Sequence, residues 1–157
     1  MAEPVLTIRT AKTTDLDAVL NLLWDDPQGR SREDLSDEAR PRYLAAFQEI
    51  ERDDSHCLLV ALADGQVAGC AQVSILPGLS YRGIRRALIE DVRVSSAERG
   101  KGFGRQLIDA ACQHAADAGC EMIELFVHQD RGGAHQFYRQ CGFEDLHRGF
   151  RKRLTGA

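Results

Sequence analysis

The stretch Arg99-Gly100-Lys101-Gly102-Phe103-Gly104 lies between an apolar-rich run, 88–94, and a segment with helical periodicity. This order predicts a strand, a glycine-rich turn and the first turn of a helix. Glycines leave backbone N–H groups accessible to a ligand, and a helix start adds unpaired N–H donors and the positive end of its dipole. Arg99, Lys101 and Arg105 add positive charge. We therefore expect residues 99–104, the glycine loop, to bind a pyrophosphate.

Two common phosphate-binding motifs do not match the glycine loop. The chain has no Gly-x-x-x-x-Gly-Lys-Ser/Thr string, and the dinucleotide motif Gly-x-Gly-x-x-Gly does not fit glycines that alternate. The pattern Arg/Gln-x-x-Gly-x-Gly/Ala does match, at Arg99, Gly102 and Gly104. In this respect the loop resembles the acetyl-CoA loop of the GNAT superfamily of N-acetyltransferases.

A second stretch, Ala134-His135-Gln136-Phe137-Tyr138-Arg139-Gln140-Cys141-Gly142-Phe143, resembles the other signature of that superfamily, a short helix that bears a tyrosine and ends in Gly-Phe. Upstream of the loop, the apolar run lies where the superfamily has a splayed strand. The resemblance covers residues 85–153. It implies that acetyl-CoA is the co-substrate, bound by the glycine loop, by Arg105 and by the main chain at Val92 and Val94.

Periodicity and turn residues predict an α+β fold, with a mixed central sheet flanked by helices in the order β-α-α-β-β-β-α-β-α-β. The chain is expected to form a single domain, 1–157. Asp64-Gly65 predicts a hairpin turn, and either Thr13 or Thr14 is expected to cap the first helix. The expected strands are 5–9, 57–63, 67–76, 85–94, 123–128 and 143–154, the last as one strand or a bent pair. The expected helices are 13–24, 37–52, 104–118 and 132–140; the expected loops are 25–35 and 77–83.

Composition narrows the class of protein. The chain has 157 residues, 43% of them hydrophobic and 28% charged, with a formal net charge of −4. These values are ordinary for a soluble globular protein, and the negative charge argues against binding to nucleic acid or to an anionic membrane. No stretch is long enough to cross a membrane, and Met1-Ala2-Glu3-Pro4 lacks the features of a signal peptide. We expect a cytoplasmic protein.

Five cysteines, at 57, 70, 112, 120 and 141, have no Cys-x-x-Cys spacing, and their number is odd. We expect reduced thiols, most of them buried, and neither a disulfide framework nor a metal site. Cys141 is interpreted as a small packing residue, with a catalytic cysteine as the alternative.

The implied reaction is the attack of a neutral amine on a thioester, which requires a proton acceptor and benefits from a proton donor. Tyr138 lies where the superfamily has a tyrosine beside the thioester sulfur. We expect it to act as the general acid, the alternative being that it only packs against the pantetheine. Glu90 is the expected general base, acting through a water, and Asp91 is expected to bind substrate. His128 is the alternative base, or a substrate contact.

Arg131 occupies a position where the superfamily often has an asparagine, seven residues before the tyrosine. The Arg-x-x-Ala-His-x-Phe-Tyr arrangement resembles a bacterial subgroup that includes aminoalkylphosphonate N-acetyltransferases. Arg131 is therefore expected to bind either the CoA phosphates or an anionic group of the substrate, the alternative being a solvated arginine of the loop. Tyr81 and Arg82, in the loop 77–83, are candidate acceptor contacts.

An acidic excess over residues 15–54 favours a cationic small-molecule amine as the acceptor, although it is also typical of solvated helix faces. Two alternatives remain open at this point. One is acetylation of proteins or peptides, and the other is a non-catalytic module that senses acyl-CoA. Exposed sheet edges further predict a homodimer.

Overall fold

A computed structural model describes residues 6–156, which form two compact units. The first unit ends at Leu125 and the second begins at Phe126. The single domain expected over 1–157 stays a prediction. The expectations for Val5, for the first four residues and for Ala157 lie outside the described residues. Among residues 6–156, no helix is both long enough and apolar enough to cross a membrane.

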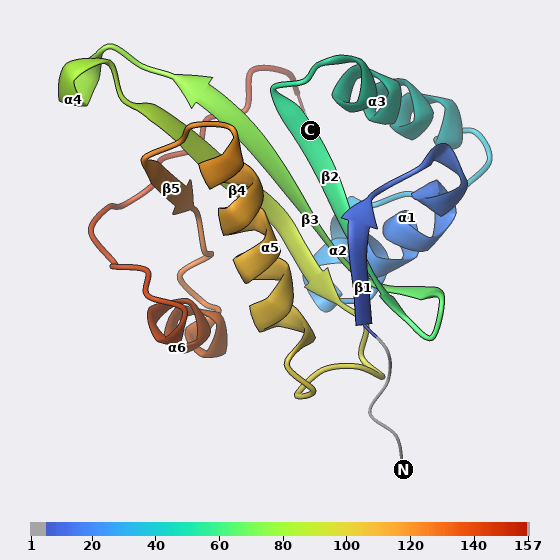
Figure 1. Cartoon of the computed structure of the whole chain (residues 1–157). Coiled ribbons are helices and arrows are strands. Elements are labelled where there is room, and N and C mark those ends of the chain that lie inside the picture. Colours follow the sequence, from blue (N-terminus) through green and yellow to red (C-terminus); the bar gives the residue numbers. More distant parts are fainter. Residues whose placement is uncertain (1–5, 157) are drawn as a thin grey trace. The chain divides into compact units, whose positions relative to one another are not determined.

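The first unit contains a five-stranded sheet in the order β1-β2-β3-β4-β5, antiparallel except for the parallel pair β4 and β5 (Figure 1). The strands are β1 (Leu6–Thr10), β2 (His56–Ala63), β3 (Gln66–Pro77), β4 (Arg85–Val94) and β5 (Met122–Leu125). Its helices are η1 (Thr13–Asp15), α1 (Leu16–Trp24), α2 (Pro27–Arg32), α3 (Arg40–Arg52), α4 (Ser80–Gly83) and α5 (Phe103–Asp117). The second unit contains α6 (Gly132–Gln140). The mixed α+β class is confirmed.

Both faces of the sheet are covered by helices. Leu58 and Val60 of β2 belong to the core cluster that α1 and α3 complete, so these helices lie on one face. Ala61 and Gly69 are paired and point to the other face, where a Cβ on Gly69 would lie 2.8 Å from Leu107 of α5. Gly69 therefore allows α5 to lie close against β3 and β4, across which it runs in Figure 1.

Local turn chemistry places several elements as expected. Asp64 and Gly65 have φ values of 48° and 81°, and left-handed conformations at both positions are typical of the tight turn of a two-residue hairpin. Pro41 lies in the first turn of α3, and Gly119, with φ of 80°, follows α5. All five cysteines are free thiols, but only Cys57 and Cys70 are buried, so the expectation that most of them are buried was wrong.

The expected loops 25–35 and 77–83 contain the helices α2 and α4, so both expectations were wrong in part. Asp26 caps α2 by accepting a hydrogen bond from the Gly29 N–H at 2.6 Å. A Cβ on Gly29 would collide with the carbonyl oxygen of Leu23, so only glycine lets α2 approach α1 this closely. The Pro-Gln-Gly-Arg-Ser stretch has the composition of a turn. The expectation failed because the tertiary contact that requires Gly29 cannot be seen in the sequence.

The cap of the first helix was also assigned wrongly. Neither Thr13 nor Thr14 caps α1, and their hydroxyls make no cap bond. Asp15 is the residue that satisfies this turn: its carboxylate accepts the Lys12 N–H at 2.7 Å and two hydrogen bonds from Arg9, at 2.7 and 3.1 Å. The Asp15 side chain is only 9% exposed.

Two expected strands differ from the structure. β5 ends at Leu125, so 126–128 lie outside it, and the expected last strand, 143–154, has no regular secondary structure. Phe150 is 99% exposed and Leu154 is 92% exposed. A strand requires a hydrogen-bonded neighbour, and within the second unit the described residues offer no other strand.

Candidate active site

Asp91 lies in a bulge on β4. Cys70 pairs with Arg93, and Gln72 pairs with Glu90. The two residues on β3 are two positions apart, whereas their partners on β4 are three apart, so β4 has one extra residue here. Asp91 has φ of 52°, a left-handed conformation uncommon for residues other than glycine, and the Cys70 thiol donates to its carbonyl oxygen at 3.4 Å. Bulges of this kind redirect side chains and often lie beside functional sites.

β4 and β5 part just before this bulge. Their parallel pairing joins Arg86–Ile89 to Met122–Leu125 and then stops, while β4 continues to Val94 along β3. The sequence predicts exposed main-chain groups here. Within the described residues, arginine side chains occupy two of the carbonyl groups, because Arg93 donates to Val92 at 3.0 Å and Arg99 donates to Val94 at 3.1 Å.

The glycine loop has the open backbone that its sequence predicts. Gly100 and Gly102 have φ values of 79° and 82°, and Gly102 caps α5. A Cβ on Gly100 would have no heavy atom within 4 Å, and one on Gly102 would meet only the Gln106 amide nitrogen, at 4.0 Å. Space next to the loop, together with the unpaired N–H groups of the first turn of α5, suits a phosphate group.

The three cations around the loop face carboxylates. Lys101 lies 3.0 Å from Glu98 and Arg105 lies 3.7 Å from Asp109. Arg99 lies 3.7 Å from Asp25, at the end of α1. All three cationic side chains are more than half exposed, so these pairs contribute little energy. The fixed part of the attraction for an anion therefore comes from the backbone.

Glu90 lies in an electrostatic setting suited to a proton acceptor. Its side chain is exposed as a whole, but partial burial of the carboxyl group raises its pKa. The neighbouring Asp91 raises this pKa further, whereas His56 lowers it. A carboxylate with a raised pKa is a stronger base, because the optimum for proton transfer lies near the working pH.

His56 is an ionisable neighbour of Glu90 that sequence reasoning missed. The strand register places His56 opposite Ser74 on the same face as Glu90, and His56 Nδ1 lies 3.0 Å from Ser74 Oγ. The other ring nitrogen lies 3.8 Å from Asp53. No local signal could reveal this, because β2 and β4 are separated by the whole of β3.

In the second unit, Tyr138 lies on α6 between two aromatic rings. The ring centroids of Phe137 and Phe143 lie 5.1 and 5.9 Å from that of Tyr138, both in edge-on geometry. His128 precedes α6 and lies 3.3 Å from Asp130, and Arg131 is the N-cap of the helix. The helix thus occurs where expected, with the aromatic packing restricting the orientation of the phenol.

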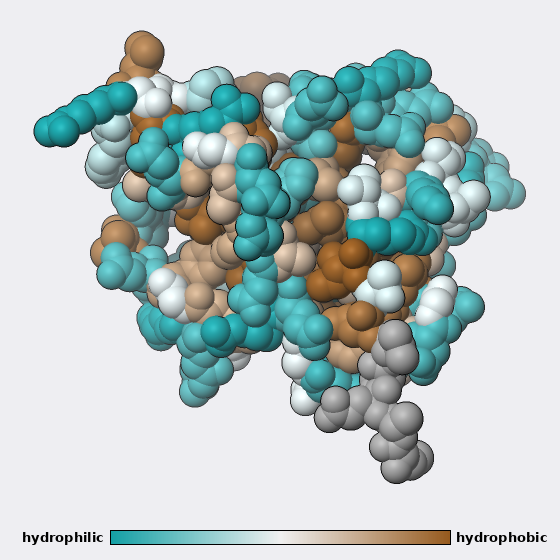
Figure 2. Space-filling model, viewed as in Figure 1, coloured by the Kyte–Doolittle hydropathy of each residue, from teal (hydrophilic) through white to brown (hydrophobic). Residues whose placement is uncertain are grey.

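Tyr81 and Arg82 lie at the tip of the β3–β4 hairpin, in left-handed conformations with φ of 51° and 63°. Tyr81 is 74% exposed, and Figure 2 shows hydrophobic and hydrophilic residues side by side near α4. From Glu90 to the hairpin end of β4 at Arg85 is about 16 Å along the strand. The structure therefore does not bring these two residues to Glu90.

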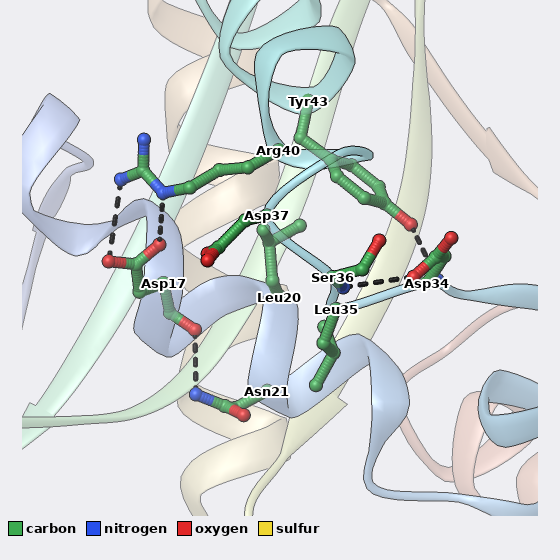
Figure 3. Close-up of a pocket in the computed structure, with 9 residues that line it drawn as sticks. All are labelled: Asp17, Leu20, Asn21, Asp34, Leu35, Ser36, Asp37, Arg40 and Tyr43. Carbon is green, nitrogen blue, oxygen red and sulfur yellow. Dashed lines mark hydrogen bonds and ion pairs between the residues drawn. The ribbon is translucent and has the colours of Figure 1, made fainter.

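A hollow of about 260 Å³ lies elsewhere, between α1, α3 and the segment that connects α2 to α3 (Figure 3). Figure 3 shows Asp37 pointing into it, Asp17 bonded to Arg40, and Asp34 beside Tyr43. None of the residues predicted to be functional lines this hollow. The described part of the chain also has no group of three or more His, Cys, Asp or Glu side chains that could hold a metal ion.

Comparison with known proteins gives a consistent result. A sequence model described as "Acetyltransferase (GNAT) family" matches residues 16–143, a range that extends over both units. Aminoalkylphosphonate N-acetyltransferase of Salmonella typhimurium is 28% identical over 96% of this chain and 93% of its own length. Thialysine N-epsilon-acetyltransferase of Bos taurus is 30% identical over 88% of this chain and 84% of its own length.

Among solved structures, one described as a transcriptional regulator from Bacillus halodurans C-125 has a TM-score of 0.92. It is 39% identical, and the match covers 96% of this chain and 100% of that chain. The chain spans only 61%, 64% and 48% of the length of three further curated relatives. The family model and the Bacillus halodurans structure therefore each match most of this chain.

Proposed function

We propose that this chain, which belongs to the acetyltransferase (GNAT) family, transfers the acetyl group of acetyl-CoA to a primary amine of a small molecule. One observation carries this proposal. The glycine loop, the parted strands β4 and β5 and the bulged Glu90-Asp91 pair all lie along one strand and the helix start that follows it. The names of the Salmonella and bovine relatives, both N-acetyltransferases of small amines, support the class of acceptor.

The residues present fit acetyl-CoA. The left-handed glycines leave free space beside the α5 N-terminus, which suits the pyrophosphate. The free edge of β4 suits a pantetheine arm that hydrogen bonds to the main chain near Val92 and Val94. Arg93 and Arg99 already donate to those two carbonyl groups, so the arm would use the remaining N–H groups or displace an arginine.

In the proposed reaction, acetyl-CoA supplies an activated thioester carbonyl and a thiol leaving group. Most alkyl amines are protonated near neutral pH, so the acceptor must lose a proton before it attacks. Glu90 accepts that proton, directly or through a water, and its raised pKa suits the task. Asp91 holds the cationic amine next to it. Tyr138 donates a proton to the departing sulfur, and its aromatic neighbours orient the phenol.

The remaining predicted residues keep supporting roles in this proposal. Arg131 binds an anionic group of the cofactor or of the acceptor, and His128 contacts the acceptor. Tyr81 and Arg82 contact it only if the acceptor is long, because they lie at the hairpin tip. A cytoplasmic homodimer completes the proposal. Pairing between two copies would use β1 or β5, the edge strands of the five-stranded sheet.

A second candidate function is a module that binds acyl-CoA without turnover. The similarity to the Bacillus halodurans protein, which is described as a transcriptional regulator, favours it. Such a module would keep the glycine loop but would need no proton acceptor. Glu90, with its raised pKa beside the bulge, therefore supports the enzyme over the sensor. Acetylation of protein or peptide amines is the third candidate, and it shares the same chemistry.

The experiment is a thiol-release assay with acetyl-CoA and pooled amines, paired with calorimetry of acetyl-CoA binding. The pools would contain aminoalkylphosphonates, lysine analogues, amino sugars and peptides. Release that depends on one pool supports the enzyme, and the pool that responds separates small-molecule from peptide acceptors. Binding without release from any pool favours the sensor. No binding at all contradicts both.

Gly102→Val is the matched control for this assay. A β-branched residue at φ of 82° is strained, and its side chain fills the space assigned to the phosphate. We expect acetyl-CoA binding to be lost in this variant. Intact binding would contradict the placement of the pyrophosphate.

A further inference from the structure

Asp25 at the C-terminus of α1 contacts the segment that leads into the glycine loop, 71 positions later in the chain. One carboxylate oxygen of Asp25, Oδ2, accepts the Ser96 N–H at 3.2 Å. The same oxygen lies 3.7 Å from Nη2 of Arg99. Asp25, at the end of α1, thus contacts both Ser96, which follows β4, and Arg99, the first residue of the glycine loop.

Arg99 is held at a second point. Its Nε donates to the Val94 carbonyl at 3.1 Å, at the last residue of β4. The guanidinium therefore bridges the end of β4 and the end of α1. The ion pairs of Lys101 and Arg105 differ, because each joins a carboxylate three or four positions away on its own segment. The ion pair of Arg99 instead reaches a distant element of the fold.

We propose that Asp25 and Arg99 form a clamp that positions the glycine loop for the pyrophosphate of acetyl-CoA, so that Arg99 is a positioning residue and not a phosphate ligand. This inference rests on the proposed function. It changes the role of Arg99, for which the sequence pattern predicts direct anion binding.

Electrostatics favour this role for Arg99. The Asp25 carboxylate beside Arg99 partly offsets the charge of the guanidinium and would itself repel a phosphate placed there. An ordered glycine loop also favours ligand binding. Gly100 and Gly102 have more backbone freedom than other residues, and a loop that is already ordered loses less entropy when a ligand binds. A contact between α1 and the loop supplies that order.

The next residue, Asp26, extends the same junction. It caps α2 through the Gly29 N–H and lies 3.5 Å from Arg93 Nε on β4. Arg93 Nε is buried and has no hydrogen bond within the described structure, so the ion pair with Asp26 offsets part of the cost of burying its charge. Two adjacent aspartates thus join the end of α1 to β4 and to the connection that follows β4.

The test compares Asp25→Ala, Arg99→Ala and the double variant by calorimetry with CoA and by the KM for acetyl-CoA. We expect each single variant to weaken binding about fivefold, as for a half-exposed charged contact, with kcat changed less than twofold. The double variant should lose less than the sum of the two single losses, because the Asp25–Arg99 contact is shared and each residue also keeps a contact of its own, to Ser96 or to Val94. Asp17→Ala is the matched control, since Asp17 is also on α1 and pairs with Arg40 at 3.0 Å. We expect it to leave binding unchanged.

A phosphate-binding role of Arg99 gives a different pattern. Arg99→Ala would still weaken binding, but Asp25→Ala would leave it unchanged or tighten it, because a negative charge near the phosphate is removed. That result would overturn the clamp, as would fully additive losses in the double variant.

Hydrogen exchange separates failure of the clamp from failure of the proposed function. Amide exchange in 95–102, measured without any ligand, should become faster in Asp25→Ala and stay unchanged in Asp17→Ala. Unchanged exchange in Asp25→Ala would overturn the clamp even if the wild-type protein binds acetyl-CoA. Absence of acetyl-CoA binding by the wild-type protein would instead overturn the proposed function.

Discussion

Two groups of acidic side chains in the first unit behave in opposite ways. At the junction of β1 and η1, hydrogen bonds from Arg9 lower the pKa of Asp15, and the Lys12 N–H adds to this effect. At the bulge of β4, burial raises the pKa of Glu90, and the adjacent Asp91 raises it further. The first carboxylate has its positive partner in direct contact, whereas the second has another carboxylate beside it.

This difference separates a site that stabilises the fold from the proposed catalytic site. The Arg9–Asp15 contact links β1 to the turn before α1, and both oxygens of the Asp15 carboxylate already accept hydrogen bonds within the protein. The Glu90-Asp91 pair combines a raised pKa with a left-handed aspartate, and both features oppose stability. Such local costs are typical of functional sites, where the surrounding fold supplies the stability.

The largest expected effect is on turnover. Glu90→Gln removes the proposed base and should lower kcat by at least about 100-fold in the thiol-release assay. Affinity for acetyl-CoA, measured by calorimetry, should stay the same, because Glu90 contacts the amine. Glu121→Gln, an exposed substitution just before β5, is the control. Near-normal turnover in Glu90→Gln would show that the base lies elsewhere, with His128 the next residue to substitute.

The next effect is on stability. Asp15→Asn should lower the free energy of unfolding by about 1 to 2 kcal/mol, because the charged contact to Arg9 is lost while solvent screens part of it. Urea denaturation measures this change, with Asp17→Asn as the control on the next helix. The folded Asp15→Asn protein should keep its kcat. A loss of activity without a loss of stability would mean that this junction also serves the site.

The pH dependence of stability should have opposite signs at the two sites. The lowered pKa of Asp15 contributes stability above its ordinary, unfolded pKa, and this is lost as the pH falls through the folded pKa. The raised pKa of Glu90 removes stability as the pH rises from its unfolded pKa through its folded pKa. Glu90→Gln should therefore be the more stable protein near neutral pH but not in acid.

Urea denaturation of the wild-type protein, Asp15→Asn and Glu90→Gln over a range of pH values tests this pair of signs. The difference between wild type and Asp15→Asn should shrink towards acid, and that between Glu90→Gln and wild type should shrink too. A Glu90→Gln protein less stable than wild type at neutral pH would contradict the direction of the pKa shift.

The smallest effect should come from Asp91→Gly. Glycine relieves the left-handed conformation but adds freedom to the unfolded chain, so the free energy of unfolding should change by less than about 0.5 kcal/mol. The KM for the amine should nevertheless rise, because the carboxylate is lost. Asp64→Gly is the matched control, since Asp64 is also left-handed, with φ of 48°, in the hairpin turn. An unchanged KM for the amine in Asp91→Gly would leave Asp91 with only a structural role.

Much of the fold could be predicted because its signals are local. The bounds of β4 and α6 agree with the prediction residue for residue, and the turn at Asp64 and Gly65 was confirmed. The predictions were wrong where tertiary contacts determine the secondary structure. The helix α2 depends on the close approach of Gly29 to α1, and the expected strand at 143–154 lacks a partner in its own unit.

The candidate site divides in the same way. The open backbone of the glycine loop follows from residues that are neighbours in the sequence, since glycine alone allows φ near 80° without strain. The roles of the site residues stay predictions. His56 and Asp25 could not have been found from the sequence, because each approaches its partner from a strand or helix far away in the chain.

By itself, the sequence determined the order of the five strands and of the helices α1, α3, α5 and α6, the glycine turn before α5 and the family to which the chain belongs. These depend on turn chemistry and periodicity over a few residues. Only the tertiary structure decided the bulge at Asp91, the raised pKa of Glu90 and the contact of Asp25 with Ser96 and Arg99. Each arises from strand register or from helix packing, which bring together groups that no local interaction could align.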